Sequence, residues 1–124
     1  MSACGGGGAP TARGAIAYNA SAGYGSIVVS HTSQPDANTD ALKKCPVGGC
    51  AIVLEFSGNG TCGSLVVSSN GAWGVGSAGS KEEADSRASE QCTKRGGVGC
   101  HLYQWNGLIL NGQPIVGQDT MQCN

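Results

Sequence analysis

The stretch GAIAYNASAGYG, residues 14–25, recurs in altered form as GSLVVSSNGAWG, residues 63–74. Each copy holds two short apolar segments around a turn, and the second turn carries Asn-Gly, a dipeptide favoured in tight hairpins. The copies align without a gap and share apolar and glycine positions, which pairs Gly14 with Gly63, Ile16 with Leu65, Tyr24 with Trp73 and Gly25 with Gly74. This pattern predicts one β-hairpin in each copy.

A second repeated motif follows each hairpin, SQPDANTDALKKC at residues 33–45 and SKEEADSRASEQC at residues 80–92. In both, a serine stands three residues before an acid, which is the pattern of a helix N-cap, and Ser80 with Glu83 makes a full capping box. Small residues recur at four-residue spacing and form a narrow stripe on each motif, made of Ala37, Ala41 and Cys45 and of Ala84, Ala88 and Cys92. We expect two helices that lie close on a sheet.

Each unit then closes with a strand-like run, CAIVLEF at 50–56 and CHLYQW at 100–105. The chain therefore contains two β-β-α-β units. The simplest closure is an α+β domain with one mostly antiparallel sheet of about six strands and both helices on one face. We expect a single domain over 13–124, with repeat one at about 13–57, repeat two at about 62–105 and a C-terminal hairpin extension at 106–124.

Seven cysteines in 124 residues indicate either a disulfide framework in an oxidising compartment or a metal site. Their spacing does not fit zinc, and neither histidine stands at ligand spacing, so we expect disulfides, no metal and no cofactor. In each unit one cysteine ends the helix and another begins the next strand. This placement predicts Cys45–Cys50 and Cys92–Cys100, and by elimination Cys62–Cys123.

The seventh cysteine, Cys4, stands in a different context from the others. It follows Ser-Ala and precedes four glycines, which matches the end of a lipobox, so we expect Cys4 to be lipidated. Residues 1–12 would then form a flexible tether, with Met1 as a start added to a chain without its signal peptide. Glycine rather than aspartate follows Cys4, which favours an outer-membrane lipoprotein facing the periplasm. The alternative is an exported soluble protein with a ragged N-terminus.

No set of residues in the sequence favours catalysis, so we expect no catalytic residues and no enzyme. We expect His31 to be a solvated loop residue, and His101 has no neighbouring acid to orient it. Glu55 stands alone on an outward strand face, whereas helix starts explain Asp36, Glu82 and Glu83.

Neither the aromatic residues nor the net charge indicates a ligand site. Core packing is a better interpretation than a ligand cage for the four aromatic residues that fall on strand positions, Tyr18, Tyr24, Trp73 and Trp105. The net charge of −1 argues against nucleic acid as a partner.

The segment NGLILNGQPIVGQDTMQC, residues 106–123, has no counterpart in the first unit. It reads as two short apolar strands around an Asn-Gly turn. Two interpretations stay open: edge strands that finish the sheet, or a projecting hairpin with an apolar tip for a partner. In the second case the contact residues are Leu108, Leu110, Asn111, Gln113 and Ile115.

The motifs GAIAY, GYG, ALKKC…C and TCGSLVVSSNGAWGVGSAGSKEEADSRASEQC…GGVGC resemble a bacterial secreted family known as domain of unknown function 4189, over about Arg13 to Trp105. The resemblance implies export to the envelope of Gram-negative bacteria or secretion by mycobacteria, and it brings no reaction and no cofactor. Some lipoproteins of this type look like immunity proteins, which implies a protein that binds and neutralises a toxin or another envelope-acting effector of a rival's secretion system. The alternative is a non-enzymatic structural or ligand-binding envelope lipoprotein, attached to the membrane only through its lipid.

Overall fold

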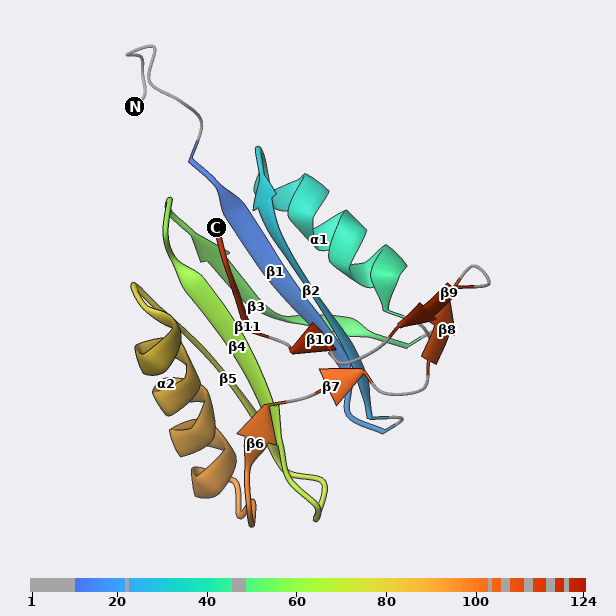
Figure 1. Cartoon of the computed structure of the whole chain (residues 1–124), viewed down its shortest axis with the longest axis vertical. Helices are drawn as coiled ribbons and strands as arrows, with labels where there is room; N and C mark the ends of the chain where they lie inside the picture. The colour runs from blue at the N-terminus through green and yellow to red at the C-terminus, as the bar shows by residue number, and fades with distance from the viewer. Residues whose placement is uncertain are drawn as a thin grey trace.

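The computed structural model describes residues 11–21, 23–45, 49–102 and 121–124, together with the backbone of four short strands between residues 104 and 119 (Figure 1). Neither helix in this described part is long and apolar enough to cross a membrane.

The first repeat forms a three-stranded antiparallel sheet with one helix. It consists of β1 (Arg13–Asn19), β2 (Tyr24–His31), α1 (Gln34–Lys44) and β3 (Ala51–Ser57), and β1 lies between β2 and β3. The helix begins where the sequence predicts, because the side chain of the N-cap Ser33 accepts a hydrogen bond from the backbone N–H of the first turn.

The second repeat builds the same arrangement. It consists of β4 (Cys62–Val67), β5 (Trp73–Ala78), α2 (Lys81–Lys94) and then two short strands, β6 (His101–Leu102) and β11 (Met121–Cys123). Here β4 is central, with β5 on one side and both β6 and β11 on the other. The predicted α+β class, the two β-β-α-β repeats and the antiparallel pairing are therefore confirmed.

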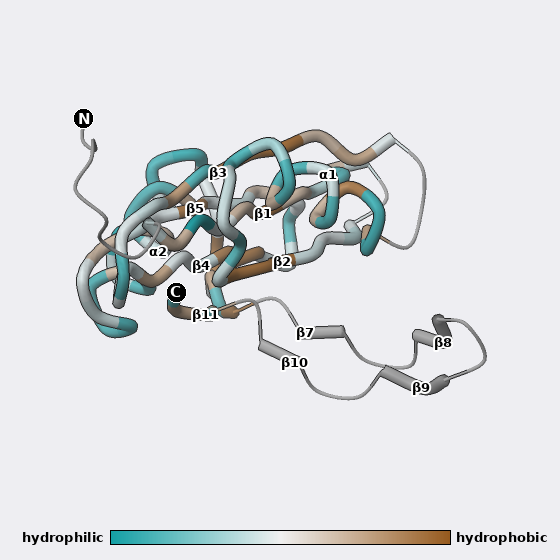
Figure 2. The backbone as a smooth tube through the Cα atoms, turned by 90° about the horizontal axis from the view of Figure 1, so that it is seen from above, coloured by the Kyte–Doolittle hydropathy of each residue, from teal (hydrophilic) through white to brown (hydrophobic). Residues whose placement is uncertain are grey.

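The two sheets are separate and stack face to face, with α1 and α2 on opposite outer faces (Figure 2). On β1, Ala15 and Ala17 pack against α1, whereas Ile16 and Tyr18 pack against Leu65 of the other sheet. The prediction of one six-stranded sheet with both helices on one face is wrong. The physical reason is that β1 and β4, which consist almost entirely of apolar and small residues, are buried on both faces, so each sheet needs a cover on both sides.

Matched glycines of the two repeats make room for one aromatic ring between the sheets. A Cβ atom at Gly14 would lie 2.4 Å from Cζ of Phe56, and one at Gly63 would lie 2.5 Å from Cε1 of the same ring. Phe56 is buried in the core between the sheets. The glycines that begin the two copies of the repeated stretch are therefore explained by packing against this side chain.

The gapless alignment of the repeats is wrong by one residue at their second strands. Tyr18 lies opposite Gly25 in the first hairpin, whereas its counterpart Val67 lies opposite Trp73 in the second. The first turn is therefore one residue longer, so that Ser26 rather than Gly25 holds the ladder position of Gly74. A gapless alignment of the two sequences does not reveal this difference in turn length, because the strands on either side of the longer turn keep the same kinds of residue.

All three predicted disulfides are present. Cys45–Cys50 and Cys92–Cys100 each join the end of a helix to the start of the following strand. Cys62 and Cys123 lie directly opposite each other on β4 and β11, with 3.9 Å between their Cα atoms. The third disulfide therefore fastens the last strand to the centre of the second sheet.

Candidate partner-binding face

The third strand of the second repeat is interrupted. Its first part, β6, pairs with Val66 and Val67, and its second part, β11, pairs with Cys62 to Ser64 of the same strand β4. Residues 103–120, which we call the arm, leave this edge after Leu102 and return to it at Met121. The expectation of a strand over 100–105 and an appended extension from 106 is therefore wrong, because the added segment is inserted within a strand.

The first repeat completes the same strand without an arm. In β3, Ile52 lies opposite Ala17 and Leu54 lies opposite Ile16, so that Val53 is the extra residue of a β-bulge. The arm begins at the same point of the ladder in the second repeat, where 18 residues stand in place of Val53 and Leu54. A bulge accepts such an insertion, because the ladder of hydrogen bonds is already interrupted there.

The arm contains two short ladders of its own. Strand β7 (Gln104–Trp105) pairs with β10 (Gln118–Asp119), and β8 (Leu108–Leu110) pairs with β9 (Gln113–Ile115). The predicted hairpin is confirmed, but β8 and β9 form a two-stranded sheet, so the interpretation that they finish the main sheet is wrong.

The register of the hairpin decides which of its residues share a face. Leu108 lies opposite Ile115 and Leu110 lies opposite Gln113, and the alternation of a strand places these four positions on one face of the hairpin. They are four of the five contact residues expected from the sequence. The fifth, Asn111, lies outside the described residues, as does Cys4.

A groove of about 310 Å³ runs along the outer edge of β2. The strands β2 and β11 lie on the same side of the molecule (Figure 2). The groove is lined by Ile27, Val28 and Val29 of β2, by His31, Asp40 and Lys44, and by Gln122 of β11. Strand β11, which follows the arm in the sequence, therefore forms one wall of this groove.

An ion cluster at the rim of the groove joins α1 to β2. Nε2 of His31 lies 2.9 Å from Oδ2 of Asp40, and Nζ of Lys44 lies 3.3 Å from the same oxygen. Partial burial would raise the pKa of Asp40, but the hydrogen bonds and charges of His31 and Lys44 outweigh it and lower this pKa below its ordinary value. Asp40 is therefore an anion at neutral pH.

The prediction of His31 as a solvated loop residue holds only in part, because the residue ends β2 and its side chain is only partly exposed. Its side chain is 28% exposed and paired with Asp40, which the chain brings to it by folding α1 back over β2. No spacing in the sequence signals this contact, because the two residues stand on different elements nine positions apart.

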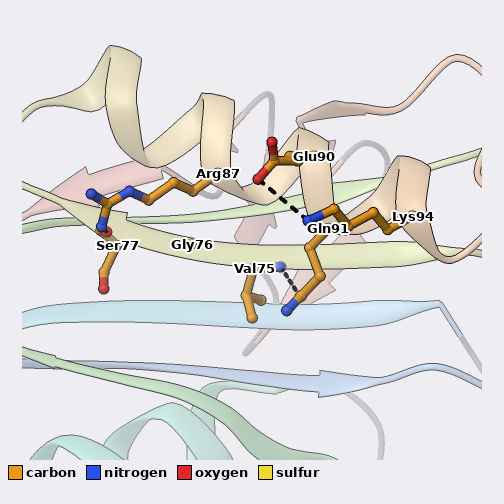
Figure 3. A pocket seen from close by; sticks show the side chains of 7 residues that line it. All are labelled: Val75, Gly76, Ser77, Arg87, Glu90, Gln91 and Lys94. Carbon is orange, nitrogen blue, oxygen red and sulfur yellow. Dashed lines mark hydrogen bonds and ion pairs between the residues drawn. The ribbon is translucent and has the colours of Figure 1, made fainter.

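The second repeat has a corresponding groove of about 360 Å³ between α2 and the outer edge of β5 (Figure 3). Side chains of α2 bond the backbone of that edge. Nη1 of Arg87 donates to the carbonyl of Ser77 over 2.8 Å, and Oε1 of Gln91 accepts from the N–H of Val75 over 2.8 Å. One turn later, Nη1 of Arg95 donates to the carbonyl of Trp73 over 3.0 Å.

Sequence reasoning missed this row of helix side chains. Arg87, Gln91 and Arg95 recur every four residues beside the stripe of small residues, which is the signal that could have found them. The guanidinium of Arg95 also lies 4.2 Å from the ring centre of Trp73, so the row is held by packing as well as by hydrogen bonds.

Other residues singled out from the sequence take structural positions. Glu55 is exposed on the outward face of β3, as predicted, and accepts a hydrogen bond from Asn38 of α1. The rings of Tyr18 and Trp73 pack between the sheets with centres 5.3 Å apart, which confirms their place in the core. His101 is exposed, with Nδ1 2.9 Å from the carbonyl oxygen of Gly99.

The remaining residues from that analysis follow the same pattern. Tyr24 is half-buried at the start of β2, and Asp36, Glu82 and Glu83 lie in the first turns of their helices, as predicted. The side chain of Trp105 lies outside the described residues. Within the part of the chain that is described, no three His, Cys, Asp or Glu side chains gather in a group able to hold a metal ion.

Residues 14–107 match the family described as Domain of unknown function (DUF4189). The chain belongs to this family. The DUF4189 match covers both repeats and ends inside the arm, before the hairpin of β8 and β9. No curated protein and no solved structure matches the chain. Membership of DUF4189 therefore accounts for the repeated frame and assigns no activity to it.

Proposed function

We propose that this DUF4189 protein is a non-enzymatic lipoprotein of the bacterial envelope that binds and neutralises a toxin or another envelope-acting effector protein, with the arm as its contact. The observation that carries the proposal is the interrupted strand. Because the first repeat closes the same strand with two residues, the β-β-α-β frame does not require an arm. Because the frame does not require these 18 residues for its folding, we infer that they serve to bind a partner.

The composition of the arm supports a protein partner. Asp119 is its only charged residue, and its hairpin places Leu108, Leu110 and Ile115 on one face. Protein interfaces have apolar centres from which charged residues are depleted. Nucleic acid would instead require a basic surface, and the arm contains neither lysine nor arginine.

Charging the hairpin is expected to abolish binding. A carboxylate at a buried interface loses its water without gaining a partner, so Leu110→Asp together with Ile115→Asp should weaken the complex by roughly 30-fold or more. The protein is used as bait on periplasmic extracts of the producing cell and its competitors. The captured toxin or effector is then purified, and its affinity for each variant is measured by calorimetry.

The matched control places the same charges on the frame. Leu42 and Val98 are the large apolar side chains that are exposed in the described residues, at 42% and 67%. Leu42→Asp with Val98→Asp should bind as tightly as the unmodified protein. If the hairpin variant also binds normally, the hairpin is only structural. If no envelope-acting toxin or enzyme binds, or if a glycan or small molecule binds saturably instead, the neutralising role is refuted.

The proposal places the protein in the periplasm, attached to the outer membrane through a lipid on Cys4. Expression of the full-length gene in a Gram-negative host should yield a mature protein whose Cys4 peptide carries a diacylglycerol mass. The adduct should be lost in Cys4→Ser. A mature protein that begins at another residue, or that keeps a free Cys4 thiol in the soluble periplasmic fraction, contradicts the anchor and leaves the neutralising role to be judged by the binding experiment.

A further inference from the structure

The edge strands β2 and β5 hold equivalent positions in the two repeats. They differ in whether helix side chains form hydrogen bonds with the outward backbone groups of the strand. The pairs from Ala15–Val28 to Tyr18–Gly25 in the first sheet correspond to those from Ser64–Gly76 to Val67–Trp73 in the second. Gly25 and Ile27 of β2 therefore stand where Trp73 and Val75 stand in β5, and Val29, beside the register shift, follows them where Ser77 stands in β5.

The outward edge of β5 is closed by its own helix. Arg87, Gln91 and Arg95 bond the backbone of alternate residues, 77, 75 and 73, which shows that these residues direct their N–H and C=O groups away from β4. A strand edge whose donors and acceptors are bonded in this way offers little to another strand.

The outward edge of β2 is not bonded by its own helix, and β11 lies beside it. By the spacing of the small-residue stripes, Asp40 and Lys44 of α1 hold the helix positions of Arg87 and Gln91. Asp40 pairs with Lys44 and with the side chain of His31, and neither helix residue bonds the backbone of the strand. Within the described residues, no group bonds the outward N–H or C=O of Gly25, Ile27 or Val29.

The other edges are less suited to accept a strand. β3 carries a bulge at Val53, in its middle, and the edge formed by β6 and β11 is divided by the arm. In β2 the bulge lies at the end, where Ser30 has a φ of 63° and its N–H donates to Oδ1 of Asn124. Residues 25–28 of β2 are thus a regular edge, and within the described residues no group bonds the outward groups of Gly25 and Ile27.

We propose that an extended segment of the partner protein adds to β2 as a further antiparallel or parallel strand along residues 25–29. Donors and acceptors that alternate at the spacing of a strand are complementary to the backbone of another extended chain. The proposal rests on the proposed function and deepens it. The arm returns to the frame at β11, whose Gln122 lines the groove beside β2, so a partner held by the arm also meets this edge.

The difference between the two edges is measurable in the free protein. Since Gln91 bonds the N–H of Val75 and no described group bonds that of Ile27, the amide hydrogen of Val75 should exchange with solvent at least several-fold more slowly. Equal exchange rates, measured by NMR at neutral pH, overturn the open edge before any partner is considered.

Closing the edge of β2 tests the binding itself. Asp40→Arg with Lys44→Gln copies onto α1 the side chains that bond β5, so that they reach the backbone of Val29 and Ile27. Asp40→Ala with Lys44→Ala is the matched control, because it removes the same ion pairs and leaves the edge open. Slower exchange of the Ile27 amide in the first variant alone verifies that the edge is closed.

Each variant is titrated with the partner captured on the unmodified protein. We expect the closed-edge variant to bind about 30-fold more weakly than the control, since two backbone hydrogen bonds are lost only in the former. Binding of the unmodified protein should also slow the exchange of the Ile27 amide. A partner that binds the closed-edge variant at full affinity and leaves Ile27 unprotected overturns strand addition and leaves the proposed function intact. Capture of no protein partner refutes both.

Discussion

Replacing Gly74 with alanine is expected to destabilise the protein by about 3 kcal/mol, at the upper end of the usual cost of overpacking. Gly74 lies in β5 directly beneath α2. A Cβ atom there would lie 2.2 Å from the carbonyl oxygen of Ala88 and 2.5 Å from the backbone nitrogen of Cys92. Both contacts are with helix backbone, which cannot turn aside as a side chain can. The whole helix would have to move away from the sheet and open the core around Val66.

Urea unfolding of Gly74→Ala measures this cost. Gly79→Ala is the matched control, because Gly79 follows the same strand and a Cβ atom there meets no atom within 4 Å. The control should change the free energy of unfolding by less than about 1 kcal/mol, in either direction. Equal stability of the two variants would falsify the close approach of α2 to β5.

Removing the disulfide between Cys62 and Cys123 is expected to have the largest effect of any disulfide removal. The two cysteines are 61 residues apart, so their bond restricts a long loop of the unfolded chain. The loop-entropy relation gives about 4 kcal/mol for a loop of this length and about 2 kcal/mol for one of five residues. The bond also holds β11 against β4, where the chain returns from the arm, although β11 is only three residues long.

The double variant Cys62→Ala with Cys123→Ala is compared with Cys45→Ala with Cys50→Ala, whose cysteines are five residues apart. Both are unfolded by urea without reductant, so that the remaining bonds stay intact. The first should lose about twice as much stability as the second. Equal losses would show that loop closure is not the main contribution, and a larger loss from the short loop would contradict the role given to Cys62–Cys123.

Local chemistry was enough to predict much of this protein from its sequence. Ser33 and Ser80 begin the helices because an N-cap depends on residues within one turn. The disulfides followed from the repeat, since a cysteine at the end of each helix and another at the next strand meet across a short loop. The hairpin of β8 and β9 followed from its Asn-Gly turn and apolar strands.

The layers could be decided only by tertiary contacts, although one signal was present. The runs GAIAY and GSLVV are apolar at nearly every position, which is typical of strands covered on both faces. That pattern is compatible with several arrangements of two sheets and two helices. The choice of a face-to-face pair depends on Phe56 fitting between Gly14 and Gly63, which lie in different repeats.

The candidate site depends still more on tertiary structure. The sequence by itself determined the repeats, the helices, the disulfides and the existence of an added apolar hairpin, because each depends on residues close together or on a repeated pattern. Only the fold decided that the arm interrupts a strand, because insertion and extension differ in pairing with β4 and not in residue order. It also decided that β5 is closed and β2 open, since that difference arises where helix side chains reach, or do not reach, the backbone of a distant strand.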